Sequence, residues 1–216
     1  MGNGKRFAAI GLTAAAVPLS FVAAPYPEQL VLQHVPTLIG LALLLAVTLR
    51  TRVSRPSFFC CIAFLWLHVV GARWLYSYVP YDELARLLTG TSLSELFGWQ
   101  RNHYDRLVHA AFGMLAVPPI AELLHRCCGV RPAAAAVLSV ACVAAAGAAY
   151  EVFEWLIAVT LSPERAEAYN GQQGDLWDPQ KDLALAGVGS IASAILVRRW
   201  LPGAAAVATP VTGREN

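Results

Sequence analysis

The stretch "AAAAVLSVACVAAAGAAYEVFEWLIAVT", residues 133–160, has the length and composition of a membrane span, yet it contains Glu151 and Glu154. About 20 predominantly apolar residues cross the hydrocarbon core of a bilayer as an α-helix. A charged side chain at the centre of such a helix costs roughly 2.5–3.5 kcal/mol on insertion scales. Two glutamates that faced lipid would therefore oppose insertion. We expect both carboxylates to face polar partners inside a helix bundle.

The whole chain has the composition of an integral membrane protein. Of its 216 residues, 57% are hydrophobic and 14% are charged, and the mean hydropathy is +0.52. These values predict an all-α fold, a polytopic helix bundle that forms a single domain over residues 1–201 within the lipid bilayer. Six segments are expected to span the membrane, at about 7–24, 30–49, 58–79, 106–124, 133–160 and 180–201. Residues 202–216 are expected to form a disordered cytoplasmic tail.

The first apolar segment has a second interpretation, as a cleaved signal peptide. Lys5 and Arg6 precede it, and the motif "FVAAP" places Ala24 at a candidate cleavage site. Pro25, directly after that site, argues against cleavage. We therefore expect the segment to remain as the first helix.

Basic residues predict the orientation of the spans. When the N-terminus is placed in the cytoplasm, the inner side collects most of the basic residues, and those on the opposite side are interspersed with acids. The residues expected inside are Lys5, Arg6, Arg50, Arg52, Arg55, Arg126, Arg131, Arg198, Arg199 and Arg214. Both termini are therefore expected in the cytoplasm. The net charge of +2 reflects this topology and does not indicate nucleic-acid binding.

Two outer loops are expected to contain short helices. The loop "YDELARLLTGTSLSELFGW", residues 81–99, alternates leucines with charges at helical spacing, which predicts amphipathic helices on the outer surface. Ser92 and Glu95 form a capping-box pattern in this loop. The loop "SPERAEAYNG", residues 162–171, begins with a candidate N-cap, Ser162, and ends in an Asn-Gly stop, which predicts one short helix.

Ionisable residues near the outer ends of the last three spans occur in pairs that share a helix face. The pairs are Asp105 with His109, Glu151 with Glu154, and Asp178 with Asp182. At a rise of about 1.5 Å per residue, they occupy one layer in the outer leaflet. Arg73 lies at a similar depth and is the expected counter-ion. Gly187 and Ser190 in the last span are expected to let the helices approach closely, which would bring the acidic faces together.

Three functions fit such a layer. One histidine with several carboxylates is a ligand mixture that divalent metals accept, and a bound metal could activate water in a hydrolase-like membrane enzyme. A transporter of a small solute or ion would use the same acids to bind cations or protons. A structural or interaction protein would use them in an ion-pair network that only stabilises helix packing. Acids outnumber bases within the spans, which favours a metal-supported site.

Three ordered motifs carry a family resemblance. They are "RNHYDRLVH" (101–109), "YEVFEW" (150–155) and "GQQGDLWDPQKD" (171–182). Together they resemble the YjdF-type family of bacterial inner-membrane proteins, a domain of unknown function, over about residues 30–200. The resemblance implies a multi-pass protein of the bacterial plasma membrane and supplies no reaction. It implies as signature residues Tyr104, Asp105, Arg106, His109, Glu151, Glu154, Asp175, Asp178 and Asp182.

The expected site is an outward-facing polar pocket within the bundle. A divalent metal ion is the expected cofactor, and its expected ligands are Asp105, His109, Glu151, Glu154 and Asp182. The expected catalytic residues are Glu151, Glu154 and His109. Substrate binding is assigned to Arg73, Arg106, Tyr104, Asp175 and Asp178. The identity of the metal, the substrate and the oligomeric state stay open at this point.

Overall fold

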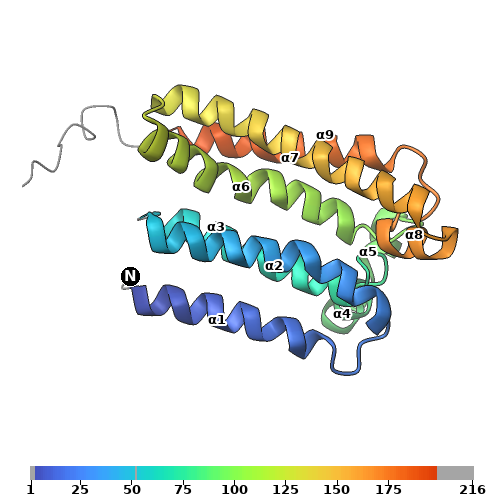
Figure 1. The fold of residues 1–216 in the computed structure, drawn as a ribbon. Coiled ribbons are helices and arrows are strands. Elements are labelled where there is room, and N and C mark those ends of the chain that lie inside the picture. The colour runs from blue at the N-terminus through green and yellow to red at the C-terminus, as the bar shows by residue number, and fades with distance from the viewer. Residues whose placement is uncertain (1–2, 52, 199–216) are drawn as a thin grey trace, which may run out of the picture.

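The structure, a computed structural model, describes residues 3–51 and 53–198. Every regular element in that part of the chain is an α-helix (Figure 1), which confirms the expected all-α class. The helices are α1 (Asn3–Ser20), α2 (Pro27–Arg50), α3 (Arg55–Arg73), α4 (Tyr81–Thr89), α5 (Leu93–Phe97), α6 (Tyr104–Cys128), α7 (Pro132–Thr160), α8 (Pro163–Asn170) and α9 (Asp178–Val197). The tail expected at 202–216 lies outside the described residues.

Five of the described helices are long and apolar enough to cross a membrane, namely α2, α3, α6, α7 and α9. The chain is therefore a polytopic helical membrane protein, as its composition predicts. The helix α1 covers most of the first expected span but is not among the five. A sixth crossing by residues 7–24 stays a prediction.

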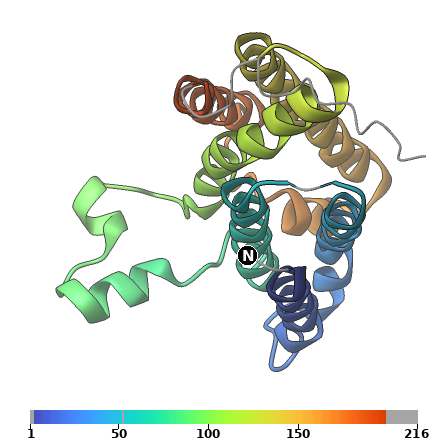
Figure 2. The same cartoon turned by 90° about the vertical axis from the view of Figure 1, so that its left-hand side faces the viewer.

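The long helices form two groups that meet along one seam. One group contains α1, α2 and α3, the other contains α6, α7 and α9, and the packing of α3 on α6 joins them. Figure 2 shows the two groups end-on. The helices α4 and α5 pack on each other and project to one side of the bundle (Figure 2). α8 packs on both α7 and α2, so it bridges the two groups at one end.

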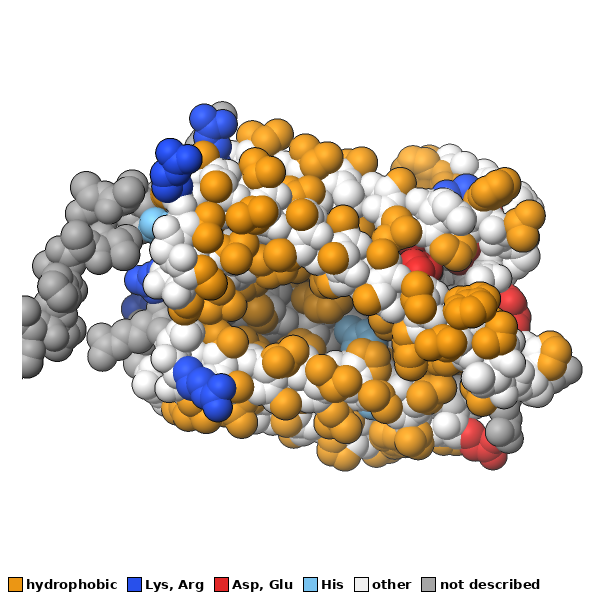
Figure 3. Space-filling model, turned by 45° about the horizontal axis from the view of Figure 1, so that its top comes forward, with side chains coloured by type: hydrophobic (Ala, Val, Ile, Leu, Met, Phe, Trp, Pro, Cys, Tyr) orange, Lys and Arg blue, Asp and Glu red, His pale blue; other side chains and the backbone are white. Residues whose placement is uncertain are grey.

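The two ends of the bundle differ in charge. Most of the Lys and Arg side chains visible in Figure 3 lie at the end where α1 begins, and the visible acids lie toward the opposite end. That acidic end also holds α4, α5 and α8 (Figure 1). The capping box expected at Ser92 and Glu95 is present at the start of α5. Leu87 and Leu88 of α4 are 82% and 73% exposed, which suits an amphipathic helix on a membrane surface.

The helix α3 ends at Arg73, before the expected residue 79. Leu75 and Tyr76 follow with φ of 50° and 58°, a left-handed conformation that terminates the helix. Tyr76 N–H donates to Gly71 O at 2.7 Å. The tyrosine ring then lies over Gly71, where a Cβ would come within 2.6 Å of it. Burial of the aromatic ring offsets the cost of the strained backbone. Hydrophobic periodicity in the sequence does not predict this contact.

The helices α6 and α9 pack closely because each has a glycine against the other's backbone. A Cβ at Gly113 would lie 2.8 Å from Ser190 N, and one at Gly189 would lie 3.1 Å from Met114 N. Ser190 is fully buried and its backbone lies at this contact, which agrees with the close approach expected there. The expectation for Gly187 is wrong, because a Cβ there would have no heavy atom within 4 Å. Small residues at the crossing point allow this approach and bring the two polar faces together.

Candidate functional site

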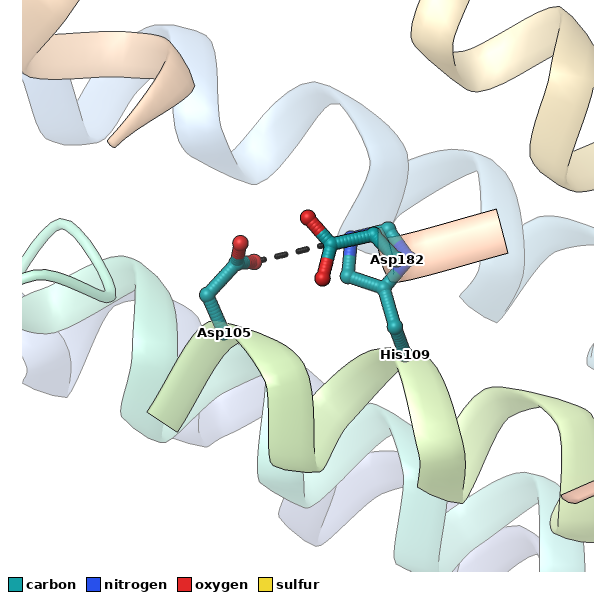
Figure 4. Close-up of side chains that lie close together, drawn as sticks. All are labelled: Asp105, His109 and Asp182. Carbon is teal, nitrogen blue, oxygen red and sulfur yellow. Dashed lines mark ion pairs between the residues drawn. The ribbon is translucent and has the colours of Figure 1, made fainter. Parts of the chain in front are cut away.

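Asp105, His109 and Asp182, here called the triad, lie close together (Figure 4), near the starts of α6 and α9. Each offers one ligand atom, and these atoms all lie within 4.8 Å of one another. His109 Nε2 is 3.6 Å from Asp105 Oδ1. Asp182 is 3% exposed, and its Oδ1 has no hydrogen-bond partner among the described residues. Buried carboxylates are normally paired, hydrogen-bonded or bound to metal.

Local interactions at the start of α6 position Asp105 and His109. Asn102 Oδ1 accepts from Tyr104 N at 3.0 Å, and Asn102 Nδ2 donates to Val79 O at 2.9 Å. Asp105 is therefore held in the first turn, where the helix dipole favours a carboxylate. His109 follows one turn later on the same face.

Asp182 is positioned in the same manner at the start of α9. Asp175 Oδ1 accepts from Trp177 N at 3.1 Å, and Pro179 occupies the first turn of the helix. Proline is preorganised for that position and has no N–H to leave unpaired. Asp182 then lies one turn inside α9 and faces α6.

Ion pairs cross the mouth of the site between the loop before α9 and the start of α6. Arg101 reaches both oxygens of Asp178, at 2.5 and 3.3 Å. Arg106 pairs with Asp175 and lies 3.4 Å from Asp178. Lys181 Nζ lies 2.6 Å from Asp175 Oδ2, and this hydrogen bond lowers the pKa of Asp175 to about 2. These direct pairs go to Asp175 and Asp178, and Arg101 and Arg106 act on the triad acids only through longer-range electrostatic interactions.

Glu151 and Glu154 face the same layer from α7. Both interact electrostatically with Asp105 and Asp182. Glu151 Oε1 is buried and has no hydrogen-bond partner among the described residues. Three helices therefore bring four carboxylates and one imidazole together. Among the described residues, only the triad gathers its ligand atoms within 4.8 Å.

Two residues expected to bind substrate have other contacts. Arg73 donates to the carbonyls of Ser20 and Val22, the latter at 3.0 Å, at the end of α1. A guanidinium at this place satisfies carbonyls that a helix C-terminus leaves unpaired. No ion pair joins Arg73 to an acid in the described part of the chain. The Tyr104 hydroxyl donates to Leu67 O at 2.9 Å, which anchors α6 to α3.

The residue-by-residue reasoning missed Arg101 and Gln173. Gln173 Oε1 accepts from Asn102 N at 2.9 Å, and Gln173 Nε2 donates to Asn102 O at 3.1 Å. This double contact fastens the loop before α9 to the start of α6. Both residues lie inside the ordered motifs at 101–109 and 171–182, and membership in those motifs is the signal that could have found them.

A cavity of about 550 Å³ begins beside the triad and runs between the two helix groups. Figure 3 shows a hollow at this level, bordered by hydrophobic side chains. Asp105, His109 and Glu154 contribute to its polar end. The triad is therefore reached from a space inside the bundle.

Comparisons with known proteins show the family of the chain. Residues 6–203 match the family model described as predicted membrane protein (DUF2238). The chain is 31% identical to inner membrane protein YjdF of Escherichia coli (strain K12) over 166 residues, which are 76% of this chain and 75% of that protein. No solved structure matches. The chain belongs to the DUF2238 family of predicted membrane proteins, which confirms the resemblance seen in its motifs.

Proposed function

We propose that this membrane protein binds a divalent metal ion at the triad and uses it to activate water for hydrolysis of a substrate. One observation carries the proposal: Asp182 is 3% exposed, its Oδ1 has no hydrogen-bond partner among the described residues, and one of its carboxylate oxygens lies within 4.8 Å of ligand atoms of Asp105 and His109. A bound metal would satisfy this oxygen and offset the excess of carboxylates. A metal that lowers the pKa of bound water also supplies a nucleophile at neutral pH.

The chemistry of the ligands narrows the metal. Imidazole is a good ligand for zinc, iron, nickel and copper, whereas calcium and magnesium prefer sites built from oxygen alone. Two carboxylates with one histidine therefore favour a first-row transition metal such as zinc or manganese over calcium. We expect tighter binding of Zn²⁺ or Mn²⁺ than of Ca²⁺.

The remaining polar residues have supporting roles in this proposal. Glu154, which lines the cavity, would act as the general base, and Glu151, three residues earlier on α7, would serve as a further ligand or proton carrier. Arg106 with Asp175 and Asp178 shapes the mouth through its ion pairs. Arg73 and Tyr104 were expected to bind substrate. Their hydrogen bonds to backbone carbonyls of α1 and α3 contribute to helix packing.

Metal analysis of the purified chain tests the proposal. The wild type, loaded with Zn²⁺ or Mn²⁺ and then desalted at neutral pH, should retain metal, and Asp182→Asn and His109→Ala should lose it. Glu122→Gln is the matched control, because Glu122 is a buried carboxylate that pairs with Arg126 at the basic end. Absence of retained metal in the wild type would remove the proposal. A purely structural network predicts lower melting temperatures in the triad variants with no metal in any sample.

We further propose that the acidic end faces outward in a bacterial plasma membrane and that both termini are cytoplasmic. The support is the collection of basic residues at the opposite end. In a variant whose five native cysteines are replaced by serine, a cysteine introduced at Thr89, in the exposed α4–α5 region, should react with a membrane-impermeant maleimide in intact cells. Reaction only after cell lysis would reverse the orientation.

Transport of a small solute or ion is the second candidate function. The observation that favours it is the length of the cavity, which reaches from the triad to Val53 near the basic end. Its lining between the two ends is mostly apolar, which disfavours a hydrated ion path. Flux of a cation into liposomes that contain the chain, lost in Glu154→Gln, would favour transport over hydrolysis.

A further inference from the structure

The cavity beside the triad is long and narrow. Its lining follows one face of α6 from Asp105 to Leu123 and one face of α2 from Gln33 to Val47. At about 1.5 Å per residue, these faces are about 27 Å and 21 Å long. A volume of about 550 Å³ whose lining extends over such lengths makes the cavity elongated. This shape fits one extended hydrocarbon chain better than a compact solute.

The cavity also opens sideways, at the depth of the hydrocarbon core. The helix α2 packs on α1, α3 and α8, and α7 packs on α6, α8 and α9, so the two are not packed as neighbours along the cavity. Leu43 of α2, 62% exposed, and Ala146 of α7, also exposed, line the space from either side of this opening. In a chain that crosses the membrane, such an opening meets lipid.

Water is a poor occupant of the middle of this cavity. Apolar cavities stay dry because water needs several polar partners. The middle of the lining includes Leu65 on α3 and Phe112 and Ile120 on α6, and their side chains offer no polar partner to water. A hydrocarbon chain from the surrounding bilayer can fill the same space without loss of hydrogen bonds.

The end of the cavity beside the triad has the opposite chemistry. Gln33 Oε1 and Asn170 Oδ1 are buried and have no hydrogen-bond partner among the described residues. Gln33 Nε2 donates to Tyr169 O at 3.2 Å, and Asn170 Nδ2 donates to Glu154 O at 3.1 Å. The oxygens of both amides are therefore left as acceptors, and the carboxylates of Asp105 and Glu154 add more. The Tyr169 hydroxyl at the same end also lacks a hydrogen-bond partner among the described residues and can donate, but acceptor oxygens outnumber it, so a group that binds here should chiefly donate hydrogen bonds.

We propose that the cavity binds one hydrocarbon chain of a membrane lipid whose head group carries hydroxyl or amine donors. The head group lies at the triad, and the chain extends along α6 toward Leu123. The second chain of a diacyl lipid stays in the bilayer through the opening between α2 and α7. This deepens the proposed function, since it names an amphipathic lipid as the substrate class. The role of the lipid as a substrate rests on the proposed hydrolysis. The binding of the lipid in the cavity does not depend on it.

Photo-crosslinking in nanodiscs tests the binding. The probe is a phosphatidylethanolamine with a diazirine in one acyl chain, and peptide mass spectrometry locates the adducts. Leu65 and Val108 line the cavity but are only 6% and 5% exposed, so bulk lipid does not reach them. Adducts at both residues are expected. Adducts confined to outward-facing residues, such as the 70% exposed Val137, would overturn the proposal.

Variants that fill the cavity give the matched comparison. Ala116→Phe in the middle of the lining, or Ala146→Phe at its rim, should reduce the adducts at Val108 by about tenfold or more, because a ring replaces the chain. Ala148→Phe is the control, since Ala148 is exposed and lies outside the lining on the same helix. Equal labelling in all three variants would refute a chain inside the cavity.

The head group is tested with a phosphatidylcholine that carries the same diazirine chain. Its quaternary ammonium has the same charge as the amine but no hydrogen-bond donor. Labelling of Val108 should be weaker by about tenfold, because buried acceptors would stay unpaired. Equal labelling by the two lipids would overturn the assignment of a donor-bearing head group.

Metal analysis of the same samples separates this inference from the proposed function. Ala146→Phe should retain metal while it loses the cavity adducts, and Asp182→Asn should show the reverse. Cavity adducts in a wild type that holds no metal would support lipid binding and remove the metal site. Metal without cavity adducts would keep the metal site and overturn lipid binding.

Discussion

Replacement of Gly113 by alanine should separate α6 from α9 and disturb the triad. The added Cβ would lie 2.8 Å from the backbone atoms Ala186 C and Ser190 N, whereas ordinary contact begins at 3.4 Å. The helices must therefore move apart by at least about 0.6 Å, because backbone cannot rotate away as a side chain can. Metal–ligand distances are held to within about 0.2 Å in real sites. Gly113 and Ala186 each lie one helical turn from a triad residue, so the shift reaches the site directly.

The matched control for this change is Gly187→Ala, because a Cβ at Gly187 would have no heavy atom within 4 Å. Both changes gain helix propensity worth up to about 1 kcal/mol. Their difference therefore isolates the clash, which should destabilise Gly113→Ala by about 1–3 kcal/mol relative to the control. Thermal melts in detergent measure stability, and competition titration with a zinc indicator measures affinity, which should fall about tenfold or more. Equal melting temperatures for the two variants would refute the close crossing.

Three further predictions concern Asp175 at the mouth of the site, Glu122 at the basic end and His68 on α3. The hydrogen bond from Lys181 lowers the pKa of Asp175 from 3.8 to about 2, so Asp175 should stabilise the fold above about pH 4 and lose that contribution toward about pH 2. The melting temperatures of wild type and Asp175→Asn should therefore differ by a constant amount from about pH 7 to pH 5 and converge at lower pH. Glu122→Ala removes an acceptor for Ser54 N at 2.8 Å and should lower the free energy of unfolding by about 1–3 kcal/mol in chemical denaturation, with metal content unchanged. His68→Leu removes a buried contact to a backbone carbonyl of α2 at 3.0 Å and should lower the melting temperature with metal content unchanged, whereas loss of metal would show that this histidine reaches the site.

Much of the fold is predictable because helix formation and membrane insertion depend on local patterns. Apolar runs predict the long helices, and the spacing within each pair of ionisable residues places both members on one face. The capping box at Ser92 and Glu95 is readable for the same reason, since its partners lie three residues apart. The end of α3 is not readable, because burial of the Tyr76 ring over Gly71 decides it.

Contacts between helices are harder to predict, because depth alone leaves the direction of a side chain open. Arg73 and Glu154 have similar depths in sequence, yet the Arg73 guanidinium donates to the carbonyls of Ser20 and Val22 at the end of α1, within its own helix group. The sequence leaves open, for the same reason, which glycine of α9 lies at the crossing with α6. Gly187 and Gly189 are two residues apart, and only the crossing point of the helices decides that Gly189 meets the backbone of α6.

The sequence by itself determined that this chain is a helical membrane protein with its intramembrane acids at one end, because the bilayer penalises charge according to depth and helical periodicity sorts the faces. The tertiary structure alone decided which acids meet. Asp105 and Asp182 are 77 positions apart, and their approach depends on glycines that let two backbones touch. The cavity beside them is likewise a property of how two helix groups pack, since no single helix encloses a space.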